Sequence, residues 1–298
     1  AGVLLISWSG ILVRLAGVEP ARSAFLRMAY ALPVLGLVGW WHQRRSPGAR
    51  AGPAVLPLAV LAGLFLGVDL VAWHASVGII GAGLGTIFPN LQVVFVGVVG
   101  RLVLGERPRR AFWMALPVIV FGVALLGFAG AGLEPGSTAT AGIVYGLLSA
   151  CFYSGYLILL RQARLRTPQA GVLQVVGSAT LGAAASTGAF AVAAGAASPA
   201  GWPADGWLVV LALGCQVGGW VALASSIHRL PASSTSVTLL LQPVLALVWA
   251  AALLGEPFTP YQLAGAGIVL VGVAAAHRAV LAGSGRPVPS LEDAPAIL

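Results

Sequence analysis

Two ionisable side chains, Asp69 and His74, stand inside a long apolar stretch of the chain. If that stretch spans a bilayer, such groups are costly and by default mark a substrate or ion pathway. Their spacing rotates them apart by about 140° around a helix, so we do not expect one proton-relay pair. Trp73 and Ser76 share the Asp69 face. We expect His74 to be a hydrogen-bonding wall of a cavity. The alternative is a histidine satisfied by a backbone carbonyl of a neighbouring helix.

Neutral polar residues form a second group of candidates. Asn90 follows Pro89, which removes one backbone donor and frees a carbonyl about one turn earlier, so we expect Asn90 to face the cavity. Gln92 and Gln242 hold corresponding places in two halves of the chain, which favours hydrogen-bonded links between helices. Gln242 is also kept as a candidate for substrate binding.

Aromatic residues form the third group, because Trp and Tyr offer a flat apolar face and one polar tip to an aromatic or amphipathic solute. Trp residues near segment ends are typical of the membrane interface; the alternative for the deeper ones is packing or contact with lipid. The substrate-binding candidates from the three groups are Trp8, Trp73, His74, Phe88, Asn90, Tyr153, Tyr156, Trp220 and Gln242. Together they predict a central, largely neutral and aromatic cavity.

The same inventory argues against catalysis. We find no His-Glu-x-x-His motif, no Gly-x-Ser-x-Gly motif and no clustered carboxylates, so we expect no enzyme and no cofactor. Cys151 and Cys215 lie inside apolar runs and are interpreted as packing residues, not as a metal site or a disulfide. A channel or scramblase-like protein stays open as an alternative, and saturable flux of a specific solute would separate a carrier from it.

The composition indicates the kind of secondary structure that positions these residues. The chain has 298 residues, of which 59% are hydrophobic and only 8% are charged, far from the averages of soluble domains. A bilayer core needs about 20 apolar residues per helix. This rule predicts an all-α integral membrane protein of about ten transmembrane helices, at 3–17, 22–42, 54–77, 80–104, 111–130, 139–162, 169–195, 206–228, 231–254 and 261–281.

All 16 basic residues are arginines, and they alternate between connections. Only Arg14, Arg22 and Arg27 are assigned to an odd-numbered connection, and the other thirteen are assigned to even-numbered connections or to the C-terminal end. The positive-inside rule then places both termini in the cytoplasm. Because the arginines lie between apolar runs, the net charge of +8 does not indicate nucleic-acid binding.

An internal repeat is present at an offset of 150 residues. Leu91-Gln92 recurs as Leu241-Gln242, and Leu104-Gly105-Glu106 recurs as Leu254-Gly255-Glu256. Five helices per repeat is an odd number, so the second half must be inverted relative to the first. Inverted repeats of this kind are the architecture of many secondary transporters, whose substrate site lies at the repeat interface.

The paired Leu-Gly-Glu motifs, the Phe25-Leu26-Arg27 sequence and the Gly-Val-Ala sequences at 122–124 and 272–274 resemble the EamA type of the drug/metabolite transporter superfamily. Within it the chain looks most like the YddG-type exporters of aromatic amino acids. The resemblance implies two inverted five-helix repeats, residues 1–130 and 139–281, around a central cavity. The Pro-rich, polar composition after them predicts a disordered tail at 282–298. The second half has Leu173-Gln174 where a counterpart of Arg27 is expected, which puts a paired role for Arg27 in doubt.

The resemblance also implies a function. We expect a secondary transporter in the bacterial inner membrane that moves small metabolites, first of all aromatic or other neutral amino acids, by alternating access and in the direction of export. Its partners are then the small-molecule substrate and the lipid bilayer, with no nucleic acid.

Overall fold

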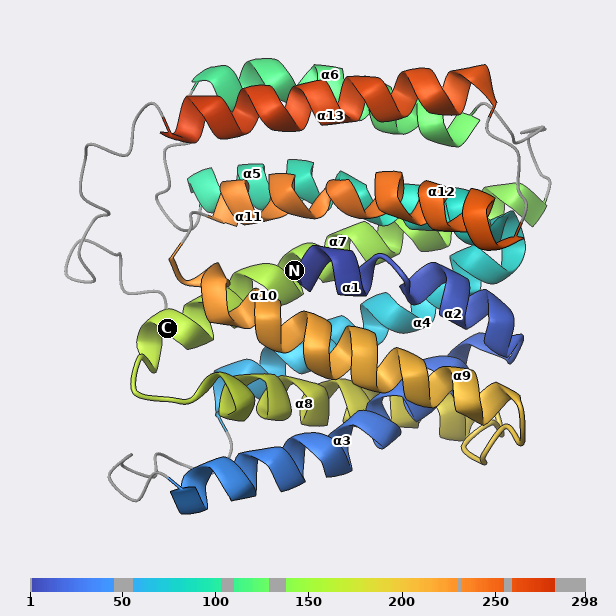
Figure 1. Ribbon diagram of the computed structural model, residues 1–298, viewed down its shortest axis with the longest axis vertical. Coiled ribbons are helices and arrows are strands. Elements are labelled where there is room, and N and C mark those ends of the chain that lie inside the picture. Colours follow the sequence, from blue (N-terminus) through green and yellow to red (C-terminus); the bar gives the residue numbers. More distant parts are fainter. Residues whose placement is uncertain are drawn as a thin grey trace.

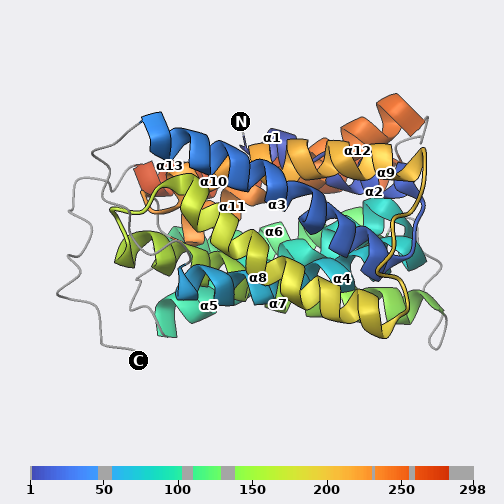
Figure 2. The same cartoon turned by 90° about the horizontal axis from the view of Figure 1, so that it is seen from below.

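The computed structural model describes residues 2–45, 56–102, 110–128, 138–229, 232–254 and 259–281. Helices account for nearly all of these residues and run side by side, in alternating directions, as one bundle (Figures 1 and 2). The Leu-Gly-Glu motif at 104–106, most of its repeat at 254–256 and the tail at 282–298 lie outside the described residues.

The first half contains α1 (Gly2–Ile6), α2 (Ser9–Ala16), α3 (Pro20–Arg45), α4 (Pro57–Ile87), the short 3-10 helix η1 (Phe88–Leu91), α5 (Gln92–Leu102) and α6 (Arg110–Phe128). The second half contains α7 (Thr138–Arg166), α8 (Val172–Ala193), α9 (Ala204–Val210), the π-helical η2 (Leu211–Gly219), α10 (Trp220–Ile227), α11 (Ala232–Leu239), α12 (Leu241–Leu254) and α13 (Pro260–Leu281).

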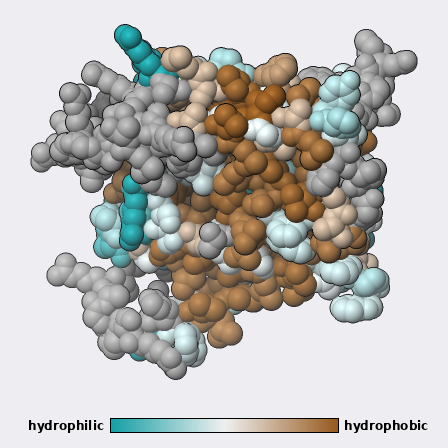
Figure 3. All heavy atoms as spheres, turned by 45° about the horizontal axis from the view of Figure 1, so that its top comes forward, coloured by the Kyte–Doolittle hydropathy of each residue, from teal (hydrophilic) through white to brown (hydrophobic). Residues whose placement is uncertain are grey.

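Among the described residues, five helical segments are long and apolar enough to cross a membrane, and they correspond to five of the expected spans. These are Pro20–Trp41, Pro57–Gly81, Thr140–Arg166, Val172–Ala193 and Ala204–Ile227. The other expected spans coincide with shorter apolar helices, among them Gly2–Ala16, Phe88–Leu102 and Phe112–Leu125. Large apolar side chains also cover much of the outer surface (Figure 3), as contact with lipid requires. The chain is therefore a multi-pass membrane protein, and the count of ten stays a prediction.

Two boundaries differ from the expected ones for identifiable reasons. The gap expected between the spans 54–77 and 80–104 is a sharp break at Gly81, whose φ of 85° and ψ of 166° are accessible to glycine and not to residues with a Cβ. At the start of the second long helix, α3 begins at Pro20, a proline whose fixed φ suits a first helical position. Arg27 lies inside this helix, as the expected span 22–42 implies, although the count of charges grouped it with the first connection.

The arginines gather at one edge of the bundle. Figure 1 shows α3, α5, α7, α10 and α13 ending at the same edge. Arg44, Arg101 and Arg229 lie at or just beyond three of these ends. Of the arginines that the structure describes, Arg14 and Arg22 lie near the opposite edge. The asymmetry agrees with the expected orientation, which stays a prediction.

The two halves meet in a reciprocal contact between α6 and α13, which pack against each other and run in opposite directions (Figure 1). A Cβ added at Gly122 would lie 3.0 Å from Val269 Cγ2, and a Cβ added at Gly272 would lie 2.6 Å from Ile119 Cγ1. In the 150-residue register Gly122 corresponds to Gly272 and Ile119 to Val269. Such an exchange of partners is what a two-fold axis between the helices produces.

Helix breaks follow the same register. In the first half η1 separates α4 from α5, which starts at Gln92. In the second half Leu240 separates α11 from α12, whose second residue is Gln242. Interrupted helices in corresponding places of two halves are a mark of transporter binding sites.

Close packing of α4 on α8 depends on small residues. A Cβ at Gly63 would collide with the Ala179 carbonyl oxygen, and a Cβ at Gly182 would collide with the Val60 carbonyl oxygen. Glycines at such positions let two helix backbones approach closely in a membrane.

We predict that Gly182→Ala destabilises the protein by about 1–3 kcal/mol, the usual cost of overpacking, because the obstacle is backbone. Gly177→Ala in the same helix is the matched control, since nothing lies within 4 Å of a Cβ there. Thermal unfolding in detergent measures both, and equal midpoints for the two variants would contradict the α4–α8 contact.

Candidate functional site

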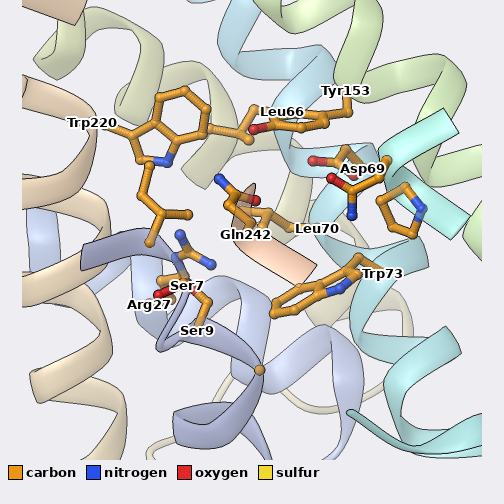
Figure 4. A pocket seen from close by; sticks show the side chains of 14 residues that line it. Ser7, Ser9, Arg27, Leu66, Asp69, Leu70, Trp73, Tyr153, Trp220 and Gln242 are labelled. Atoms are coloured by element: carbon orange, nitrogen blue, oxygen red, sulfur yellow. The ribbon is translucent and has the colours of Figure 1, made fainter. Parts of the chain in front are cut away.

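A cavity lies where the break between α1 and α2 faces α3, α4, η1, α7, α10 and α12 (Figure 4). Both halves of the chain contribute to it. The 14 lining residues are Ile6, Ser7, Ser9, Gly10, Arg27, Leu66, Asp69, Leu70, Trp73, Pro89, Asn90, Tyr153, Trp220 and Gln242.

Aromatic rings form much of the wall. Trp73 comes from α4, Tyr153 from α7 and Trp220 from α10 (Figure 4). Tyr153 lies edge-on to Trp220 with ring centroids 6.1 Å apart, and Tyr156 supports Trp220 from behind at 4.7 Å. Edge-to-face contacts of this kind hold rings in fixed orientations, so the wall is built before any solute enters.

Two opposite charges face this space. Arg27 on α3 is 2% exposed and Asp69 on α4 is 6% exposed. Among the described residues no ion pair joins their side chains, and Figure 4 shows Gln242 between them. Arg27 and Asp69 are thus two ionisable side chains in a lining whose other residues are neutral. The sequence identified Asp69 as an ionisable group but did not count it or Arg27 among the binding residues.

The two charges have different surroundings. Asp69 Oδ1 accepts a hydrogen bond of 2.5 Å from Ser149 Oγ of α7. Arg27 Nε is buried without a hydrogen-bond partner. Two further buried donors of the lining, Gln242 Nε2 and Trp220 Nε1, are also unpartnered. A cavity with three unpartnered hydrogen-bond donors, and with a carboxylate that has one hydrogen bond from the protein, is suited to a polar ligand.

Five of the nine predicted binding residues line the cavity: Trp73, Asn90, Tyr153, Trp220 and Gln242. Their contact with a substrate stays a prediction. The lining also includes Ser7 and Ser9, which the sequence did not single out. The signal for them is the helix break between Ile6 and Ser9, which apolar periodicity does not reveal.

The other four predicted residues lie outside the lining. His74 is buried behind Trp73, edge-on to its ring at 4.9 Å. Tyr156 packs against the back of Trp220. Phe88 fills the space left by Gly146 of α7, where a Cβ would lie 2.5 Å from Phe88 Cβ.

Trp8 is the fourth and has a role in packing between the halves. Its ring stacks on Trp249 of α12 with centroids 4.6 Å apart. Trp249 Nε1 donates a hydrogen bond of 2.9 Å to Ser7 Oγ, in the break between α1 and α2. This stacked pair ties the first helices of the chain to the second half beside the cavity.

The profile of the EamA-like transporter family matches the chain twice, over residues 1–128 and over residues 140–276. A crystal structure of another protein, 18% identical in sequence, superposes with a TM-score of 0.72 and covers 94% of this chain and 95% of that chain. At this identity the likeness shows a shared fold alone. No functionally curated protein matches the chain in sequence.

We predict that Ser149→Ala destabilises the protein by about 1–3 kcal/mol, because the buried Asp69 carboxylate loses its hydroxyl donor. Ser154→Ala is the control on α7, since its hydroxyl donates at 2.6 Å to the Ala150 carbonyl of its own helix and has only a longer contact of 3.3 Å to the Gln92 carbonyl of α5. Thermal unfolding at neutral pH measures the difference, and a Ser154 variant as unstable as the Ser149 variant would argue against a special role for this bond.

Proposed function

The chain belongs to the EamA-like transporter family, and we propose that this membrane transporter of small molecules exports aromatic or other neutral amino acids across the bacterial cytoplasmic membrane. The observation that carries the proposal is the cavity between the halves, with rings from α4, α7 and α10 around a polar centre (Figure 4). Flat rings receive an aromatic or branched side chain, and the polar centre receives the backbone groups of an amino acid.

Alternating access is the proposed mechanism. Two halves of like sequence and opposite orientation offer two packings of similar energy, one open to each side of the membrane. The reciprocal contact of α6 and α13 supplies a pivot that keeps its partners in either state. The break at η1, between α4 and α5, and the break at Leu240, between α11 and α12, are points at which these helices can bend. Binding residues drawn from both halves then face one side or the other as the halves rock.

The cavity carries one formal positive and one formal negative charge, so its net charge is zero with Arg27 and Asp69 both ionised. A zwitterionic amino acid adds no net charge either. The carrier therefore has no electrostatic need for a co-transported ion, and we propose that transport does not require a proton gradient.

Uptake of radiolabelled phenylalanine, tryptophan and leucine into liposomes holding the purified protein tests this proposal. We predict saturable uptake that persists without a pH gradient. Uptake that never saturates would favour a channel, and uptake of none of a wide set of amino acids would contradict the proposed cargo.

Trp73→Ala is predicted to weaken saturable uptake about tenfold or more, which corresponds to roughly 1.4 kcal/mol of lost binding. The physical reason is the loss of an indole face from the cavity wall. Trp202→Ala is the control, because Trp202 is 86% exposed and lies outside the lining. Equal apparent affinities in the two variants would show that the cargo does not touch this wall.

A further inference from the structure

We propose that the cavity binds the two ends of an amino-acid backbone separately, Arg27 taking the α-carboxylate and Asp69 taking the α-ammonium. This assignment deepens the proposed function and rests on it. It names the chemical group that the site selects, a zwitterion, and the two residues that select it.

The burial of the two charges is the first step. Arg27 and Asp69 are each at least nine-tenths buried, yet no ion pair between them is present in the part of the chain that the structure describes. A charge removed from water costs several kcal/mol unless it is paired and hydrogen-bonded, and the cost is larger still inside a membrane. Two opposite charges that face one cavity without a direct ion pair are matched by a ligand with two opposite charges.

The donors near Arg27 indicate which end of the ligand goes there. Arg27 Nε, Gln242 Nε2 and Trp220 Nε1 are buried N–H donors without a partner. Figure 4 shows Arg27 and Trp220 on the side of the cavity away from Asp69, with Gln242 between them and Asp69. A carboxylate has two oxygens and about four lone-pair positions. Arginine binds such a group through two parallel hydrogen bonds, which adds geometric selectivity to charge.

The surroundings of Asp69 suit the other end. Ser149 occupies Oδ1 with one hydrogen bond, and the described contacts leave Oδ2 to the cavity. An ammonium group has three donors and no acceptor, so it fits a carboxylate and is excluded from the donor cluster around Arg27. The ligand side chain then extends toward the rings of Trp73 and Tyr153.

Both charges belong to the first half of the chain, on α3 and α4, which pack against each other. α7 and α8 of the second half pack on the same two helices, and Ser149 of α7 bonds Asp69, so the spacing of the charges is kept in a motion that moves α3, α4, α7 and α8 together. Trp220 and Gln242 come from the second half. A cargo held by its head group on these packed helices and covered by Trp220 and Gln242 remains bound while α10 and α12 move.

Molecules that lack one charge leave a buried charge unpaired, which a site built for both groups rejects strongly. The test is equilibrium binding to the full chain in detergent, followed by tryptophan fluorescence because Trp73 and Trp220 line the cavity. The probes are phenylalanine, phenethylamine and 3-phenylpropionate, together with the aliphatic set of leucine, isoamylamine and isocaproate. We expect the zwitterion of at least one set to bind about 100-fold or more tightly than the matching amine and acid.

Two variants make the test specific. In Arg27→Met we expect the amine to bind within about tenfold of the zwitterion, and in Asp69→Asn we expect the same of the acid, since each variant removes one of the two charge requirements. Arg14→Gln, an exposed arginine of α2, is the control and keeps the preference of the natural chain. A merely structural role of either residue weakens all three probes alike and does not produce these opposite changes.

The outcomes separate this inference from the proposed function. Equal binding of zwitterion, amine and acid to the natural chain overturns the two-charge site while an amino-acid transporter stands. The same loss for all probes in both variants also overturns it. Binding of none of the six probes overturns the amino-acid cargo and this inference together.

Discussion

Charges inside a membrane protein need partners, and this requirement governs the centre of the molecule. Arg27 and Asp69 are both withdrawn from water and both face the cavity, without an ion pair between them among the described residues. Water at this depth is scarce and lipid offers no hydrogen bonds. The lining of serine hydroxyls, amide groups and indole N–H groups is the polar medium that replaces water there. The aromatic rings around these polar groups limit the polar part of the cavity to its centre.

The surrounding helices hold this centre in place through symmetry. Gly122 and Gly272 exchange partners across the α6–α13 contact, and the breaks at η1 and Leu240 fall in the same 150-residue register. The charges do not obey the symmetry, because Arg27 has Leu173-Gln174 in place of a counterpart. The symmetric arrangement of helices allows two equivalent packings. The two charges at the centre are asymmetric, because both come from the first half of the chain.

Much of the frame could be predicted from the sequence because lipid contact demands long apolar runs and the repeat recurs without gaps. The centre was harder to predict. The expected span 22–42 contains Arg27, but the count of charges grouped it with the first connection, and the sequence alone did not show that its side chain faces a cavity. His74 lies behind Trp73 and not on the cavity wall. The sequence did not predict this, because a residue's place on a helix face does not say which neighbouring helix covers that face. Trp8 faces Trp249 because the helix breaks after Ile6, which hydropathy does not register.

The most direct test of the central claim is an experimental structure of the protein with phenylalanine or leucine bound. The account predicts the amino acid in the cavity between the halves, with its carboxylate within hydrogen-bond distance of the Arg27 guanidinium and its ammonium within hydrogen-bond distance of the Asp69 carboxylate. An amino acid bound elsewhere, or bound in this cavity with Arg27 and Asp69 turned away from it, would contradict the account.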